Sequence, residues 1–147
     1  MLFLLVLLLI TFAILIKKWI SEWDPRILVQ STIDNHYYLV RNIPTRQQTA
    51  DILAMLNQRL MKIIEEGKKD NSPEHIQAIN RLAMRYDPIN LSESLIEEGM
   101  TSFTVDKGKD ISLCVRTRDA KDEPYDLSLL TMVLVHEAAH IKPFCDL

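Results

Sequence analysis

The sequence predicts an α+β protein in which an N-terminal transmembrane helix precedes a small domain of helices and a short, mainly antiparallel sheet. Three observations lead to this prediction. Residues 1–16 contain one polar side chain and no charge. Two later segments each contain two runs of strand-forming residues joined by a short polar turn, as in a β-hairpin. Three further segments carry apolar patterns that are typical of helices.

The apolar N-terminal segment is predicted to anchor the chain in a membrane. A spanning helix needs about 20 residues, so we expect it over residues 1–20, where Lys17 and Lys18 extend it towards the interface. Trp19 and Trp23 suit the interfacial region. A cleaved signal peptide is the alternative, but it requires a charged n-region and a small-residue cleavage site. Because the lysines follow the segment, the domain is expected in the cytoplasm, behind a single-pass anchor in the lipid bilayer.

Residues 21–26 are expected to form a linker, and residues 27–147 one domain of ordinary size. The formal charge is −3, with acidic and basic residues interspersed. A basic patch is absent from the sequence, so nucleic acid is not indicated as a partner. The two cysteines, Cys114 and Cys145, are too few for a disulfide framework.

The domain is predicted to begin with strands. Residues 27–33 and 37–43 are rich in β-branched and aromatic side chains, which favour strands. The Asp-Asn pair at residues 34–35 suits the turn between them.

Two helices are predicted next. Thr45 and Gln48 form a capping-box pattern at the start of the first, and Gly67 is a natural terminator at its end. Ser72 precedes a proline at the first position of the second helix, which Pro88 stops.

The following region predicts a second hairpin. Residues 92–98 suit a turn of helix, and residues 101–105 and 111–117 read as two strands. Residues 106–109 contain a glycine and form the loop between these strands. Residues 118–124 are charged, lack a periodic apolar pattern and are expected to be a loop.

A last helix is expected over residues 127–141, capped by Asp126 and ended by Pro143. The side chains around its histidines are uncharged. We therefore expect this helix to be buried nearly all round.

This helix carries the sequence His136-Glu137-Ala138-Ala139-His140. Residues four apart share a helix face, so His136 and His140 can bind one zinc ion. Glu137 follows the first ligand, where a carboxylate can take a proton from zinc-bound water. The pattern predicts a zinc-dependent peptidase with Zn²⁺ as cofactor and a peptide or protein as substrate. The alternative is a buried helix with two structural histidines and an ion-paired glutamate.

A zinc enzyme needs a third protein ligand. Asp146 lies ten positions after His136, which is the spacing of the third ligand in the longer zinc-peptidase motif, although Pro143 replaces the glycine of that motif. Cys145 is another candidate, whereas His36 and His75 are expected to be surface or structural residues. The simplest interpretation is that the chain stops before its third ligand.

The motif and the segments before it resemble the WLM and SprT-like zincin metallopeptidases, particularly the membrane-anchored members of large DNA viruses. The resemblance covers residues 35–147 and rests on the segments Thr101–Val105, Lys107–Lys109, Ile111–Arg116 and Leu130–Ile141. It implies a zincin core with a small sheet beside the active helix, whose edge strand holds an extended peptide. It also implies that His136 and His140 are zinc ligands and Glu137 the general base.

Two departures from the family qualify this expectation. Ala138 replaces a leucine that is frequent there, and the further histidine and aromatic-containing helix that follow the family motif are absent. The competing function is therefore a non-catalytic, membrane-anchored interaction domain, either an inactive or a truncated zincin. A structural or regulatory metal site without hydrolysis is a third interpretation.

Overall fold

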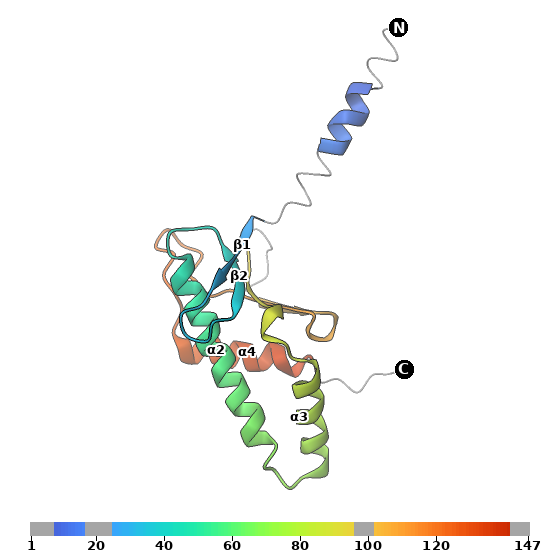
Figure 1. Cartoon of the computed structure of the whole chain (residues 1–147), viewed down its shortest axis with the longest axis vertical. Coiled ribbons are helices and arrows are strands. Elements are labelled where there is room, and N and C mark those ends of the chain that lie inside the picture. Colours follow the sequence, from blue (N-terminus) through green and yellow to red (C-terminus); the bar gives the residue numbers. More distant parts are fainter. Residues whose placement is uncertain (1–7, 17–24, 96–101, 142–147) are drawn as a thin grey trace.

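The computed structural model describes residues 8–16, 25–95 and 102–141 (Figure 1). Residues 8–16 are helical. The elements that follow are, in chain order, β1 (Arg26–Gln30), β2 (Tyr37–Arg41), α2 (Arg46–Gly67), α3 (Pro73–Arg85), the 3-10 helix η1 (Pro88–Asn90), β3 (Leu91–Glu93), β4 (Ser102–Val105), the 3-10 helix η3 (Asp106–Gly108), β5 (Asp110–Leu113) and α4 (Leu127–Ala139).

The prediction of a transmembrane helix over residues 1–20 is wrong for the part of this segment that the structure describes. A helix that crosses a hydrocarbon core of roughly 30 Å needs about 20 residues. Among the described residues, no helix has the length and apolar character needed to cross a bilayer. Lys17, Lys18, Trp19 and Trp23 lie outside the described residues.

The sheet of the described residues is mixed, which corrects the expectation of a mainly antiparallel one. Its five strands have the order β1-β2-β3-β5-β4. The two hairpins, β1–β2 and β4–β5, are antiparallel, whereas β3 pairs in parallel with both β2 and β5. The α+β character is thus confirmed, and the parallel pairs arise because β3 is inserted between the hairpins.

The hairpins follow the sequence pattern closely. Asn35, with a φ of 60°, provides the turn between β1 and β2. The loop between β4 and β5 contains Lys107 and Gly108, both at positive φ. In contrast, the helical turn predicted over residues 92–98 is wrong where the structure describes it, because its first residues belong to β3. A three-residue strand is too short to show an alternating pattern.

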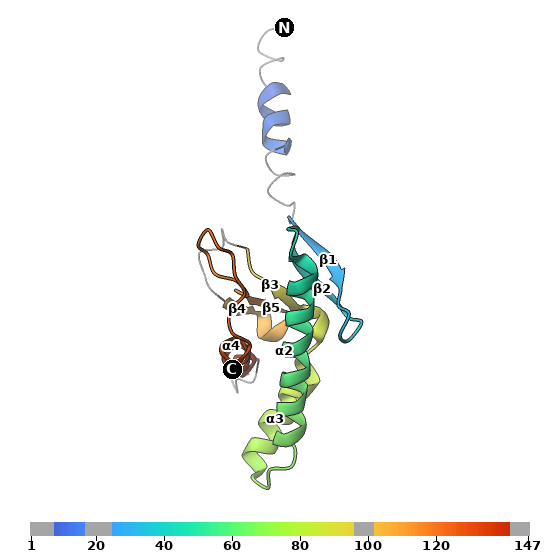
Figure 2. The same ribbon diagram turned by 90° about the vertical axis from the view of Figure 1, so that its left-hand side faces the viewer.

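Helices α2 and α4 pack on the same face of the sheet (Figure 2). α3 returns beside α2 and extends away from the strands (Figure 1). The strand registers place a continuous set of buried apolar side chains under the helices, namely Tyr38, Val40, Leu91, Ile111 and Leu113. Thr104 of β4 lies on this same face because it pairs with Ile111.

A buried charge network ties the loop before α4 to the sheet. Glu93, which is 1% exposed, accepts a hydrogen bond from the Arg41 Nε at 2.8 Å. The Arg41 Nη2 also donates to Asp122 at 2.8 Å. Arg116 donates to the backbone oxygen of Asp122 and to Gln48 of α2. Gln48 therefore does not form the predicted capping box, although α2 begins where that box predicts.

The two glycines in the described residues are sites of close packing. A Cβ at Gly67 would lie 2.8 Å from the Ile79 Cδ1, so this glycine lets α2 and α3 approach each other. Gly108 has a φ of +100°, and a Cβ there would lie 2.9 Å from the Ile141 Cδ1. The β4–β5 loop thus contacts the C-terminal end of α4.

Gly108→Ala is expected to lower the free energy of unfolding by about 1–3 kcal/mol, because it combines an unfavourable φ with overpacking. Urea denaturation measures this change. Ile141→Val removes the Cδ1 atom, so the double variant should recover part of the loss. An unchanged urea midpoint for Gly108→Ala would contradict the described loop conformation.

A hydrogen-bonded cluster joins the β1–β2 turn to α2 and α3. The Asp34 carboxylate accepts hydrogen bonds from the Tyr38 hydroxyl at 2.6 Å and the Asn57 amide at 3.2 Å. The Tyr86 hydroxyl donates to the Asn57 Oδ1. Burial opposes ionisation of Asp34, but these hydrogen bonds and one from the His36 backbone outweigh it and hold the pKa of Asp34 below its usual value.

Because the pKa of Asp34 is lower in the folded state, its contribution to stability is present above the unfolded-state pKa of 3.8 and is lost as the pH falls through the folded-state value. Asp34→Asn should therefore make stability less dependent on pH below about pH 4. Urea denaturation at several acidic pH values measures this slope. Glu65→Gln, at an exposed position of α2, is the control, and equal slopes for the two variants would contradict the prediction.

Candidate metal centre

Helix α4 carries the predicted site residues and begins as the sequence indicates. The Asp126 carboxylate accepts hydrogen bonds from the backbone N–H groups of Ser128 at 2.8 Å and Leu129 at 3.3 Å. These bonds hold the pKa of Asp126 below its usual value. Leu130, Leu134 and the residues that continue their stripe face the core. The α-helix ends at Ala139, and His140 is its C-cap in a helical conformation.

The expectation that this helix is buried nearly all round is wrong. Met132 is 72% exposed, Leu129 48% and Val135 38%. His136 and His140 are also exposed, whereas Glu137 is 7% exposed. The 100° step between successive helix residues separates the motif into an outward-facing pair of imidazoles and an inward-facing carboxylate.

The two histidines lie close enough to share an ion. Their Nε2 atoms are 3.3 Å apart, and their ring planes are 83° from parallel. Two nitrogens that each lie about 2.05 Å from a tetrahedral zinc ion are about 3.3 Å apart. The side chains therefore fit two positions of a zinc coordination sphere. The same distance also suits an N–H···N hydrogen bond between neutral rings.

A residue of strand β4 holds the Glu137 side chain in place. The Thr104 hydroxyl donates to the Glu137 Oε2 at 2.9 Å and lies 3.2 Å from the Glu137 backbone oxygen. Within the described residues, no ion pair involves Glu137. The alternative of a buried helix with an ion-paired glutamate is therefore not found there. A buried carboxylate with one neutral donor is a costly arrangement that a nearby cation would relieve.

The third ligand is not found among the described residues, where no three metal-binding side chains come together. Asp146 and Cys145 lie outside the described residues. His36 is exposed beside Asp34 in the β1–β2 turn, at 3.2 Å. His75 is exposed on α3 and pairs with Asp70 at 2.8 Å. Neither histidine joins His136 and His140.

Thr104 is the residue of this site that the sequence did not reveal. It lies 33 positions before Glu137, and one threonine in a strand carries no signal of its own. The available clue was its place in the predicted β4–β5 hairpin, which put alternate side chains of β4 on the helix-covered face.

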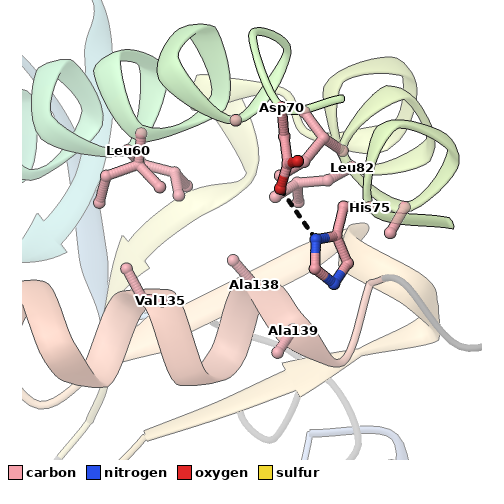
Figure 3. A pocket seen from close by; sticks show the side chains of 11 residues that line it. Leu60, Asp70, His75, Leu82, Val135, Ala138 and Ala139 are labelled. Carbon is pink, nitrogen blue, oxygen red and sulfur yellow. Dashed lines mark hydrogen bonds and ion pairs between the residues drawn. The ribbon is translucent and has the colours of Figure 1, made fainter. Parts of the chain in front are cut away.

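Two of the cavities that border α4 lie on different sides of this helix. An open groove of about 500 Å³ contains His136 and Glu137 in its wall and reaches Ser102 of β4. The other cavity, of about 360 Å³, lies where α4 faces α2 and α3 (Figure 3). Leu60, Leu82 and Ala138 line it, with the Asp70–His75 pair at its edge. Neither His136 nor Glu137 contributes to this second cavity, so the groove beside β4 is the one that belongs to the candidate site.

The chain is similar to an uncharacterised protein of Acanthamoeba polyphaga mimivirus, with 35% identity over 116 residues. The similarity covers 77% of this chain and 58% of the viral protein. The chain thus matches somewhat more than half the length of that relative. No protein-family description matches the chain, and no solved structure does.

Thr104→Val should lower the free energy of unfolding by about 1–3 kcal/mol, because it leaves the buried Glu137 carboxylate without its donor. Thr104→Ser keeps a hydroxyl and should cost less. Urea denaturation of both variants measures the difference. Equal stabilities of the valine and serine variants would show that the hydrogen bond contributes nothing.

Proposed function

We propose that this chain contains the active-site helix of a zinc-dependent metallopeptidase of the zincin type, related to the WLM and SprT-like enzymes. The observation that carries the proposal is the 3.3 Å separation of the His136 and His140 Nε2 atoms, with Glu137 beside them on the same helix. The mixed sheet with α4 packed along β4 and β5 is also consistent with the core that the resemblance implies.

Each residue has a distinct role in the proposed site. His136 and His140 would hold the ion through their Nε2 atoms, with a third ligand from outside the described residues. When bound, the ion would activate a water molecule for attack and polarise the carbonyl oxygen of the substrate. Glu137 accepts the proton of the attacking water and passes it to the leaving amine. The Thr104 hydroxyl orients the Glu137 carboxylate, so Thr104 is a positioning residue.

The proposed substrate is an extended segment of a peptide or protein. β4 is at the edge of the described sheet, and its inner side pairs with β5. The backbone groups on the outer side of an edge strand can bind an extended chain as an additional strand. Such a chain would run past Glu137, because Thr104 of β4 contacts this residue.

A non-catalytic interaction domain is the second candidate function. The observation that favours it is the set of exposed apolar side chains on α4, together with the lack of a third ligand among the described residues. In this case the helix serves to bind a partner protein, and His136 and His140 form the N–H···N contact between neutral rings.

Zinc binding and hydrolysis by the full chain separate the two functions. The chain should bind about one zinc ion, and EDTA should lower its melting temperature. His136→Ala and His140→Ala should remove both effects. His75→Ala, at an exposed histidine of α3 paired with Asp70, is the matched control and should change neither.

Glu137→Gln should keep the zinc ion and reduce peptide hydrolysis by about 10²- to 10⁴-fold, because it removes the general base. Metal analysis and cleavage of a peptide mixture, followed by mass spectrometry, measure the two quantities. A chain that binds no zinc under these conditions, or a glutamine variant as active as the wild type, would contradict the proposed peptidase.

A further inference from the structure

The cavity between α2, α3 and α4 exists because small residues meet where these helices approach one another (Figure 3). Each of the three helices contributes at least one of them, namely Gly67, Ala78, Ala138 and Ala139. They leave a space of about 360 Å³. Sites for small molecules usually have volumes of about 300–1,000 Å³. The space is therefore large enough for a small organic ligand.

The remaining wall of this cavity is mostly apolar. Its larger apolar side chains are Leu60, Ile63, Ile79, Leu82 and Val135. Ile63 is 39% and Val135 38% exposed, so the cavity is open to solvent at these two side chains. Water in an apolar space finds few polar partners, and an alkyl group that displaces it gains the free energy of apolar burial. The wall thus favours an apolar group.

A polar pair lies at the edge of the cavity. The Asp70 carboxylate accepts a hydrogen bond from the Ser72 backbone N–H at 3.0 Å and lies 2.8 Å from the His75 Nδ1. These contacts hold the pKa of Asp70 below its usual value, so this carboxylate is ionised at neutral pH. Lys69, the nearest cation in the sequence, pairs with Glu66 at 2.8 Å. The edge therefore presents an anionic group to a ligand.

Helix ends add to the negative potential at this edge. α2 ends at Gly67 and α4 at Ala139, and both residues line the cavity. Helix C-termini carry a partial negative charge that favours cations. The N-terminus of α3 has the opposite sign, but Glu74 in its first turn is a second carboxylate. A cationic head group is therefore favoured over an anionic one.

We propose that this cavity binds a small amphiphile, with its apolar tail among the three helices and a cationic amine at the Asp70–His75 pair. An ammonium group has three N–H donors and no acceptor. It can donate to the Asp70 carboxylate and, when the His75 Nδ1 donates to Asp70, to the His75 Nε2. A carboxylate head group would instead be repelled by Asp70. An alcohol would lack the ion pair.

This site lies on the reverse side of the helix that carries the candidate metal centre. Ala138 and Ala139 line the cavity and are placed between the two motif histidines in the sequence. The wall that the described residues form contains neither of those histidines. Binding of the amphiphile is thus independent of the proposed peptidase and of its zinc ion.

Isothermal titration calorimetry of the full chain with butylamine, hexylamine and octylamine tests the proposal. Affinity should rise by about 3- to 4-fold for each added CH2 group until the cavity is filled. Octylamine should also bind about 3-fold or more tightly than octanol, and octanoate should bind most weakly. Equal affinities of butylamine and octylamine, or tighter binding of octanoate than of octylamine, would overturn the proposal.

Two variants locate the binding site. Ala78→Leu fills the cavity and should weaken octylamine binding by about 10-fold or more, whereas Ala120→Leu, in an exposed loop outside the cavity, should not. Asp70→Asn should make octylamine and octanol bind almost equally, and Glu65→Gln, at an exposed position of α2, is its control. Melting temperatures show which variants are folded. If Ala78→Leu does not fold, the Asp70→Asn comparison decides, and wild-type head-group selectivity in this variant contradicts the proposal.

A titration in EDTA separates the cavity from the metal centre, because an amine can also bind zinc. The affinity for octylamine should be unchanged in EDTA and in His136→Ala. Loss of binding under either condition would place the amine at the metal centre, so the inference would be wrong while the proposed function stands. Binding that persists supports the cavity, whether or not the chain is a peptidase. Failure of the wild type to bind octylamine overturns the inference.

Discussion

The packing of the buried stripe of α4 against the core, together with the hydrogen bond from Thr104 to Glu137, determines how this helix is rotated about its own axis against the sheet. Successive residues of a helix are separated by 100°. A rotation by one residue would point His136 towards β4 and move Glu137 away from its donor. The outward direction of the two imidazoles and the exposure of Met132 therefore follow from the same packing that buries the carboxylate. The candidate site and its groove both depend on this rotational setting.

The parts of the fold that the sequence predicts well are those with local signals. The β1–β2 turn, the start of α2, and the capped start of α4 depend on residues within a few positions of one another. β3 was missed because three residues show no alternation. The sheet was consequently expected to be mainly antiparallel, although the insertion of this one strand makes two of its four pairings parallel.

In the candidate site, too, the local features were predictable from the sequence and the long-range contacts were not. The spacing of His136 and His140 is a local property of a helix, and their Nε2 atoms do meet. Thr104 and the Arg41–Glu93 pair act across 33 and 52 residues, where periodicity contains no information. The exposure of α4 could not be inferred from its apolar composition, because burial depends on which neighbours cover a helix. The N-terminal segment illustrates the same limit, since apolar composition alone led to the prediction of a spanning helix.

The order of the strands also has a consequence for folding. All described parts of the candidate site, β4, β5 and α4, come from one stretch between residues 102 and 141. The pairing of β2 with β3, in contrast, joins Leu39 to Ser92. Contacts between residues near in sequence require less loop-closure entropy and form faster. The pairing of β4 with β5 therefore closes a much shorter loop than the pairing of β2 with β3.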